Sequence, residues 1–75
     1  MKPNHTDEGV ISFIEHHHYT RLGNPVFRVH LDNGNVYFTK SNSAVNVDIM
    51  SPVFRGPTVR LLLTEAHRIW DISVI

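Results

Sequence analysis

The chain has 75 residues, with seven Lys and Arg against seven Asp and Glu, and no cysteine. This length holds one domain with one core, and the lack of cysteine excludes disulfides and thiolate metal sites. The balanced charge is unusual for a nucleic-acid-binding domain, and no apolar run approaches the roughly 20 residues of a membrane span. We expect a flexible N-terminus over residues 1–8 and a single domain over residues 9–75.

Turn residues divide the chain into five extended segments and one short helical segment. The first extended segment runs from about Gly9 to Thr20, and Gly23-Asn24-Pro25 separates it from the second, Val26 to Asp32. The second segment alternates apolar and polar residues, which is typical of a half-buried strand. Pairing the two segments brings His30 near Glu15, in a register that the sequence leaves open.

Asn33-Gly34 predicts a tight hairpin between the second segment and a third. Asn-Gly suits the two positive-φ positions of a type I′ turn, which places Tyr37 opposite His30 and Phe38 opposite Val29. In this register one side of the hairpin faces the core and the other faces solvent. The expected core side consists of Phe27, Val29, Leu31, Val36 and Phe38. The expected solvent side consists of Arg28, His30, Tyr37 and Thr39.

A short helix is expected between residues 41 and 50, because Val45 and Ile49 lie on one helical face and Ser41 or Asn42 can cap the N-terminus. Several residues of this segment are β-branched, and helices of this length are marginal on their own. Packing over the end of a sheet must therefore stabilise this helix.

The last two extended segments are Thr58 to Thr64 and Arg68 to Ile75. The first of them alternates, with inward positions Val59, Leu61 and Leu63 and outward positions Arg60 and Leu62. In the second, Ile69 and Ile72 are three residues apart. This spacing breaks strict alternation and predicts a bulge or a strand buried on both sides.

The element order is therefore β-β-β-α-β-β. This is the order of the oligonucleotide/oligosaccharide-binding (OB) barrel, whose helix lies between strands three and four. We predict an all-β fold, a small five-stranded OB-like barrel with one short helix between its third and fourth strands. An SH3-like barrel, which also has about five strands, is the alternative.

The second and third strands form the ligand face of OB barrels, so the solvent side of the hairpin is the first candidate site. Tyr37 can stack under a base, and Arg28 can supply a cation. The predicted nucleic-acid-binding residues are Arg28, His30, Tyr37, Thr39, Lys40 and Arg55. Ordinary cross-strand pairs on a solvated sheet face contain the same residue types.

A second candidate surface would form if Trp70 faced outward beside Leu62. The two side chains would then make an apolar patch suited to a protein partner or to a second copy of the chain. The predicted bulge leaves the direction of Trp70 open.

The run His16-His17-His18 invites a metal interpretation. On a strand His16 and His18 point to one side and His17 to the other, and two imidazoles can share a zinc ion. A third protein ligand is not evident, so we expect no metal site and no cofactor. No catalytic arrangement has support either, and we expect a protein that is not an enzyme.

Five segments together resemble small uncharacterised proteins of actinobacterial phages. They are Gly23-Asn24-Pro25-Val26-Phe27-Arg28-Val29, Leu31-Asp32-Asn33-Gly34, Ser43-Ala44, Phe54-Arg55-Gly56-Pro57 and Leu63-Thr64-Glu65-Ala66-His67-Arg68-Ile69. Those proteins carry a G-N-P-x-F/Y-x-V strand and a closing L-T-x-A-G-R-I hairpin. His67 stands where that pattern has Gly, so either His67 takes a left-handed conformation or the turn differs. The resemblance implies a phage or mobile-element origin and action in a bacterial cytoplasm, but no activity.

These observations predict a small, cytoplasmic, non-enzymatic binding module. The favoured partner is single-stranded nucleic acid on the hairpin face. The alternative is a phage-encoded protein-interaction or homo-oligomerising protein that engages a host or phage component. No membrane partner is expected, because no apolar run is long enough to span a bilayer. Secretion is not expected either, because residues 1–6 hold one Lys and no apolar signal segment follows them.

Overall fold

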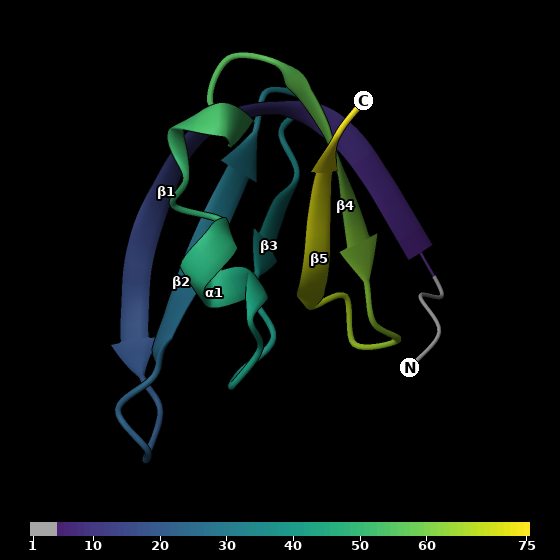
Figure 1. The fold of residues 1–75 in the computed structure, drawn as a ribbon. Coiled ribbons are helices and arrows are strands. Elements are labelled where there is room, and N and C mark those ends of the chain that lie inside the picture. The colour runs from purple at the N-terminus through teal and green to yellow at the C-terminus, as the bar shows by residue number, and fades with distance from the viewer. Residues whose placement is uncertain (1–4) are drawn as a thin grey trace.

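The computed structural model describes residues 5–75, which form one five-stranded antiparallel sheet with a short helix (Figure 1). The strands are β1 (His5–Tyr19), β2 (Pro25–Leu31), β3 (Val36–Phe38), β4 (Thr58–Leu63) and β5 (Ile69–Val74). The helix α1 (Val45–Asp48) and a 3-10 turn, η1 (Pro52–Phe54), lie between β3 and β4. The predicted element order is confirmed. Within residues 5–75, no helix has the length and apolar character to cross a membrane.

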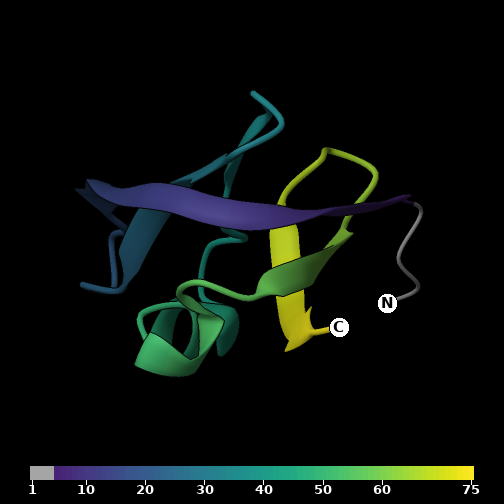
Figure 2. The ribbon, with the colours of Figure 1, turned by 90° about the horizontal axis from the view of Figure 1, so that it is seen from above.

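β1 is the longest strand and joins the two halves of the sheet. Its residues 5–10 pair with β4 and its residues 11–19 pair with β2, which gives the strand order β3-β2-β1-β4-β5. Figure 2 shows β1 as one long ribbon that crosses the molecule from side to side. Residues 5–8 were expected in a flexible N-terminus, and this is wrong, because they pair with β4 from His5 to Glu8. Residues 1–4 of that predicted tail lie outside the described residues.

β1 changes its pairing partner from β4 to β2 next to the β2–β3 hairpin loop. Gly9 permits the close approach of Asp32 from that loop. The Val10 N–H donates to Asp32 Oδ1 at 3.0 Å, and the Asp32 N–H donates to the Val10 carbonyl at 2.8 Å. A Cβ atom on Gly9 would lie 2.8 Å from Asp32 Oδ1. A larger residue at position 9 would therefore displace the carboxylate that fixes the loop to β1.

The three hairpin loops formed by residues 5–75 share one geometry. In each, the N–H of the residue before a three-residue loop donates to the carbonyl of the residue after the loop. The N–H of the third loop residue donates to the carbonyl of the residue before the loop. This is a type I turn followed by a left-handed residue. The left-handed residues are Gly23 (φ 85°), Gly34 (φ 91°) and His67 (φ 59°). The left-handed conformation of His67 is thus confirmed, and the type I′ turn at Asn33-Gly34 is wrong.

The extra loop residue moves the β2–β3 register by one position. Val29 pairs with Tyr37 and Arg28 with Phe38, where the type I′ turn required Val29 opposite Phe38. A shift of one residue exchanges the two sides of a strand. Tyr37 therefore packs against the core, whereas Val36 and Phe38 lie on the side of Arg28. The predicted faces of β3 are corrected accordingly.

The core lies between the inner side of the sheet and α1. Its buried residues are Ile11, Val29, Leu31, Val45, Ile49, Val59, Leu61, Leu63, Ile69 and Ile72. Phe27, expected in the core, is partly buried and packs against it. Thr39 was expected on the solvent side, but it is fully buried, and its Oγ1 accepts the Phe27 N–H at 2.9 Å.

The helix α1 packs over one side of this core. Its weak intrinsic propensity led us to expect that packing would stabilise it. Val45 and Ile49 are buried, but Val47 is 79% exposed. Neither Ser41 nor Asn42 caps α1; Ser43 Oγ accepts the Val45 N–H instead, at 3.3 Å.

The alternation of β4 is confirmed, with Val59, Leu61 and Leu63 buried. The β4–β5 register shifts between the Leu62–Asp71 and Leu63–Ile69 pairs, which confirms a bulge at Trp70. The outer edges of the sheet meet at one isolated parallel bridge, Thr39 to Ile69, so the sheet is not a closed barrel.

Candidate functional site

The side of β1, β2 and β3 that points away from the core carries two rows of side chains across the strands. One row is Phe13, His30 and Val36, and the other is Glu15, Arg28 and Phe38. We call this surface, together with the neighbouring His17 and Arg68, the outer face. Aromatic, apolar and charged groups alternate on it at the spacing of a pleated sheet.

Phe13 is the most open ring of the first row. It is 50% exposed, and its ring stacks on the imidazole of His30 with 3.9 Å between centroids and 15° between planes. His30 therefore supports one side of Phe13. Val36, across from His30 on β3, is 44% exposed and extends the apolar surface.

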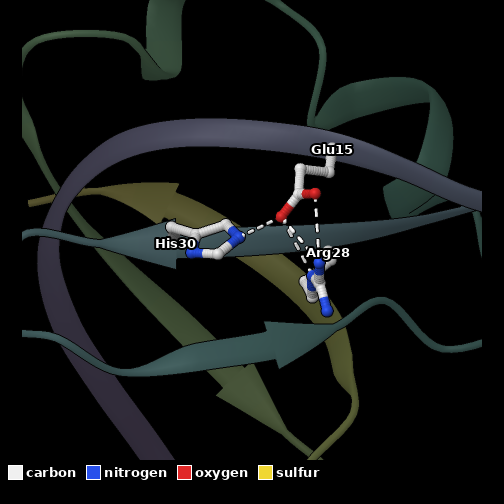
Figure 3. Close-up of polar contacts among 3 residues, drawn as sticks. All are labelled: Glu15, Arg28 and His30. Carbon is white, nitrogen blue, oxygen red and sulfur yellow. Dashed lines mark hydrogen bonds and ion pairs between the residues drawn. The ribbon is translucent and has the colours of Figure 1, made fainter.

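Glu15 connects both rows through Arg28 and His30 (Figure 3). Arg28 Nε lies 3.0 Å from Glu15 Oε1 and Arg28 Nη2 lies 3.0 Å from Glu15 Oε2. His30 Nε2 contacts Glu15 Oε1 at 2.5 Å. The side chains of Glu15 and Arg28 are 39% and 40% exposed, so the ion pair remains accessible from outside.

These contacts keep the carboxylate charged. The hydrogen bonds from Arg28 and then His30 lower the pKa of Glu15 from 4.5 to about 2, against an opposing contribution from desolvation. The hydrogen bond and charge of Glu15 in turn raise the pKa of Arg28. The pair therefore presents a positive and a negative group side by side, with no net charge.

Phe38 ends the second row between two further side chains. The His17 ring lies 4.6 Å from the Phe38 ring, and Arg68 Cζ lies 5.0 Å from its centroid, in the geometry of a cation–π contact. Arg68 comes from the start of β5, where the Thr39–Ile69 bridge brings β5 next to β3. Arg68 is not part of the Glu15–Arg28 ion pair, so Glu15 does not neutralise the positive charge of Arg68.

The predicted nucleic-acid-binding residues are only partly brought together. Arg28 and His30 lie on the outer face, but Thr39 is buried and Tyr37 lies on the core side. Lys40 is half-buried beside Ile69, to whose carbonyl its N–H donates at 2.7 Å. Arg55 follows η1, in the connection to β4, and belongs to none of these strands.

Tyr37 has a structural partner instead. Its hydroxyl donates to Asp7 Oδ2 at 2.6 Å. Burial, followed by this hydrogen bond and the charge of Asp7, raises the pKa of Tyr37 to about 12. The side chain that was expected to stack on a base thus connects β3 to the N-terminal half of β1.

The apolar patch predicted for Leu62 and Trp70 stays a prediction, with both residues half-buried. Leu62 is half-buried, and its cross-strand neighbours are the polar residues Thr6 and Asp71. Trp70 sits in the β5 bulge, and its Nε1 is buried without a hydrogen-bond partner within the described part of the chain.

The alternation expected for His16-His17-His18 is interrupted by a register shift. His16 pairs with Phe27 and His18 with Val26, so His17 is an extra residue whose ring reaches Phe38. Among residues 5–75, no group of three or more His, Cys, Asp or Glu side chains is arranged to hold a metal ion.

Phe13, His17, Val36, Phe38 and Arg68 are outer-face residues that the sequence did not assign to a site. The predicted proximity of Glu15 and His30 is confirmed and was the available signal, since residues two apart on a strand share a face. By that rule Phe13 and His17 lie on the same face of β1 as Glu15. Finding Phe38 and Arg68 required the correct turn length and the contact between the sheet edges.

Comparison of the chain with protein-family models, with curated proteins and with solved structures finds no match. Function is therefore inferred from the geometry of the outer face.

Proposed function

We propose that the protein is a non-enzymatic binding module that holds single-stranded nucleic acid on the outer face. The observation that carries the proposal is the half-exposed Phe13 ring, stacked on His30 on the same face as Arg28 and Arg68. Single-strand-binding proteins combine exposed aromatic rings with cations, and each stacked base is worth roughly 1–3 kcal/mol. Phe13 takes the role that the sequence suggested for Tyr37.

An OB-like arrangement of the sheet supports the same proposal. The edges of β3 and β5 approach each other at the Thr39–Ile69 bridge, and α1 lies between β3 and β4. We infer a partly open OB-like barrel rather than an SH3-like one, whose helical content is at most a short turn late in the chain. In OB barrels the face of strands two and three binds oligonucleotides, and that face is part of the outer face.

The charge of the face predicts weak salt dependence. Glu15 cancels Arg28, which leaves Arg68 and the nearby Lys40 to contact phosphates. For one or two phosphate contacts, the logarithm of the binding constant should fall with the logarithm of salt concentration with a slope of about −0.7 to −1.4. Stacking, not charge, would then supply most of the affinity.

Fluorescence anisotropy with a short labelled oligothymidylate at low salt tests the proposal. Phe13→Ala should weaken binding about five- to a hundredfold, the equivalent of one lost stacked base. Leu22→Ala is the matched control, because Leu22 is an 80% exposed apolar residue in the β1–β2 loop. Absence of binding by the wild-type protein, or equal binding by Phe13→Ala, would reject the proposal.

A protein partner, or a second copy of this chain, is the alternative proposal. It is supported by three large exposed side chains along α1 and η1, namely Val47 (79%), Met50 (49%) and Val53 (61%). Sedimentation tests self-association: a dimer disrupted by Met50→Glu, but not by Leu62→Glu, would favour this surface. A monomer that binds oligothymidylate would favour the first proposal.

A phage or mobile-element origin and a bacterial cytoplasmic location stay predictions from the sequence resemblance.

A further inference from the structure

Arg28 is held in one orientation by the carboxylate of the neighbouring strand. Its Nε and Nη2 atoms each lie 3.0 Å from a Glu15 oxygen, so one edge of the planar guanidinium is occupied (Figure 3). The other edge carries the N–H groups of Nη1 and the second N–H of Nη2. The Arg28 side chain is 40% exposed, which leaves part of it open to a ligand on the outer face.

The pairing with Glu15 determines which ligand group suits these donors. A phosphate on the free edge of Arg28 would be attracted by the guanidinium and, from a greater distance, repelled by the Glu15 carboxylate on the other edge. A neutral group with two acceptors meets the two directed donors without that repulsion. Glu15 thus makes Arg28 a better partner for a base edge than for a phosphate.

Guanine is the purine whose edge matches two parallel donors. It presents the acceptors O6 and N7 side by side, and a bidentate contact from Arg to these atoms is the commonest specific contact in protein–DNA complexes. On the same edge adenine presents a donor beside its acceptor, cytosine a donor, and thymine a single acceptor with a methyl group.

Phe13 lies next to this arrangement. Phe13 and Glu15 are two residues apart on β1, as are His30 and Arg28 on β2, which corresponds to about 7 Å along a strand. A base that stacks on Phe13 therefore has the Arg28 side chain as a neighbour on the same face.

We propose that the outer face prefers guanine in its single strand, with Arg28 as the specificity-determining residue and Glu15 as its positioning residue. This inference rests on the proposed function and adds a base preference to it. The ligand class is single-stranded nucleic acid that contains guanine.

The wild-type protein provides the first test. Its affinity is measured for labelled oligothymidylate, for the same strand with one central guanine, and for that strand with 7-deazaguanine, which lacks N7. Guanine should tighten binding about five- to a hundredfold, and 7-deazaguanine should lose most of this gain. Equal affinities for all three strands would overturn the inference and leave the proposed function standing. If none of the strands bound, the proposed function would fall and the inference with it.

Two variants test the residue roles. Arg28→Lys keeps the charge but loses the planar pair of donors, so oligothymidylate binding should persist while the guanine preference disappears. Glu15→Gln removes a negative charge, so it should strengthen oligothymidylate binding and reduce the ratio of guanine to 7-deazaguanine affinity. A purely structural role of Glu15 would instead weaken binding to all strands and leave that ratio unchanged. A guanine preference retained by Arg28→Lys would contradict the role of Arg28.

Discussion

His67 adopts a left-handed backbone conformation at the tip of the β4–β5 hairpin, where the other two hairpins have Gly23 and Gly34. This conformation costs a residue with a Cβ roughly 1–2 kcal/mol, whereas glycine pays roughly 0.5–1 kcal/mol in chain entropy. His67→Gly should therefore be about 0.5–1 kcal/mol more stable than His67→Ala in urea denaturation. Both variants lose the stack of His67 on His5, which has 4.5 Å between ring centroids. A glycine variant no more stable than the alanine variant would contradict this assignment.

Glu15 makes stability depend on pH. Its pKa falls from an ordinary 4.5 to about 2 on folding, mainly through the hydrogen bonds from Arg28 and His30. A carboxylate with a lowered pKa stabilises the fold above pH 4.5 and loses that contribution as the pH falls from 4.5 to 2. The urea midpoint of the wild type should therefore fall more steeply over this range than that of Glu15→Gln. Glu65→Gln, on the exposed β4–β5 turn, is the control and should follow the wild type. Parallel curves for wild type and Glu15→Gln would refute the expectation.

Asp7 connects the N-terminal half of β1 to the β2–β3 hairpin through hydrogen bonds. Its carboxylate accepts hydrogen bonds from the Tyr37 hydroxyl at 2.6 Å and from Asn35 Nδ2 at 2.7 Å. Burial acts to raise the pKa of Asp7, but the hydrogen bonds from Tyr37, Asn35, the Glu8 N–H and Asn33 together lower it. This connection holds the hairpin in the register that directs Phe38 outward.

Removal of the Tyr37 hydroxyl should weaken this connection. Tyr37→Phe is expected to lower the free energy of unfolding by about 1 kcal/mol near neutral pH. Because the pKa of Asp7 is lowered on folding, the difference should shrink as the pH falls below 3.8 and the carboxylate becomes protonated. Tyr19→Phe is the matched control, since Tyr19 is 64% exposed. Chemical denaturation at several pH values checks both variants, and an equal loss in both would argue against the Asp7 contact.

The register of the β2–β3 hairpin could not be predicted from the local sequence. Asn-Gly is compatible with a two-residue type I′ turn and with a three-residue loop that has Gly in the left-handed position. The hydrogen bonds between Asp32 and Val10 join the loop to β1, far away in the sequence, and accompany the longer loop. Local turn preference could predict the hairpin but not this contact, so Tyr37 and Phe38 were assigned to the wrong sides. The alternation of β4 and the bulge of β5 could be predicted because they depend on apolar spacing alone.

β1 contributes residues to the outer face and also pairs with β4. A ligand on the outer face would contact β1, β2, β3 and Arg68, on the side of the sheet opposite to the core and α1. The second candidate surface, along α1 and η1, belongs to other elements (Figure 1). The two proposed functions therefore predict different sets of perturbed residues.

Mapping amide chemical shifts by NMR during titration with an oligonucleotide that contains one guanine distinguishes these sets most directly. Binding on the outer face predicts the largest changes at Phe13, Glu15, Arg28, Phe38 and Arg68, with Val47 and Val53 unchanged. Changes confined to the segment from Val47 to Val53, or no changes at low salt, would contradict it.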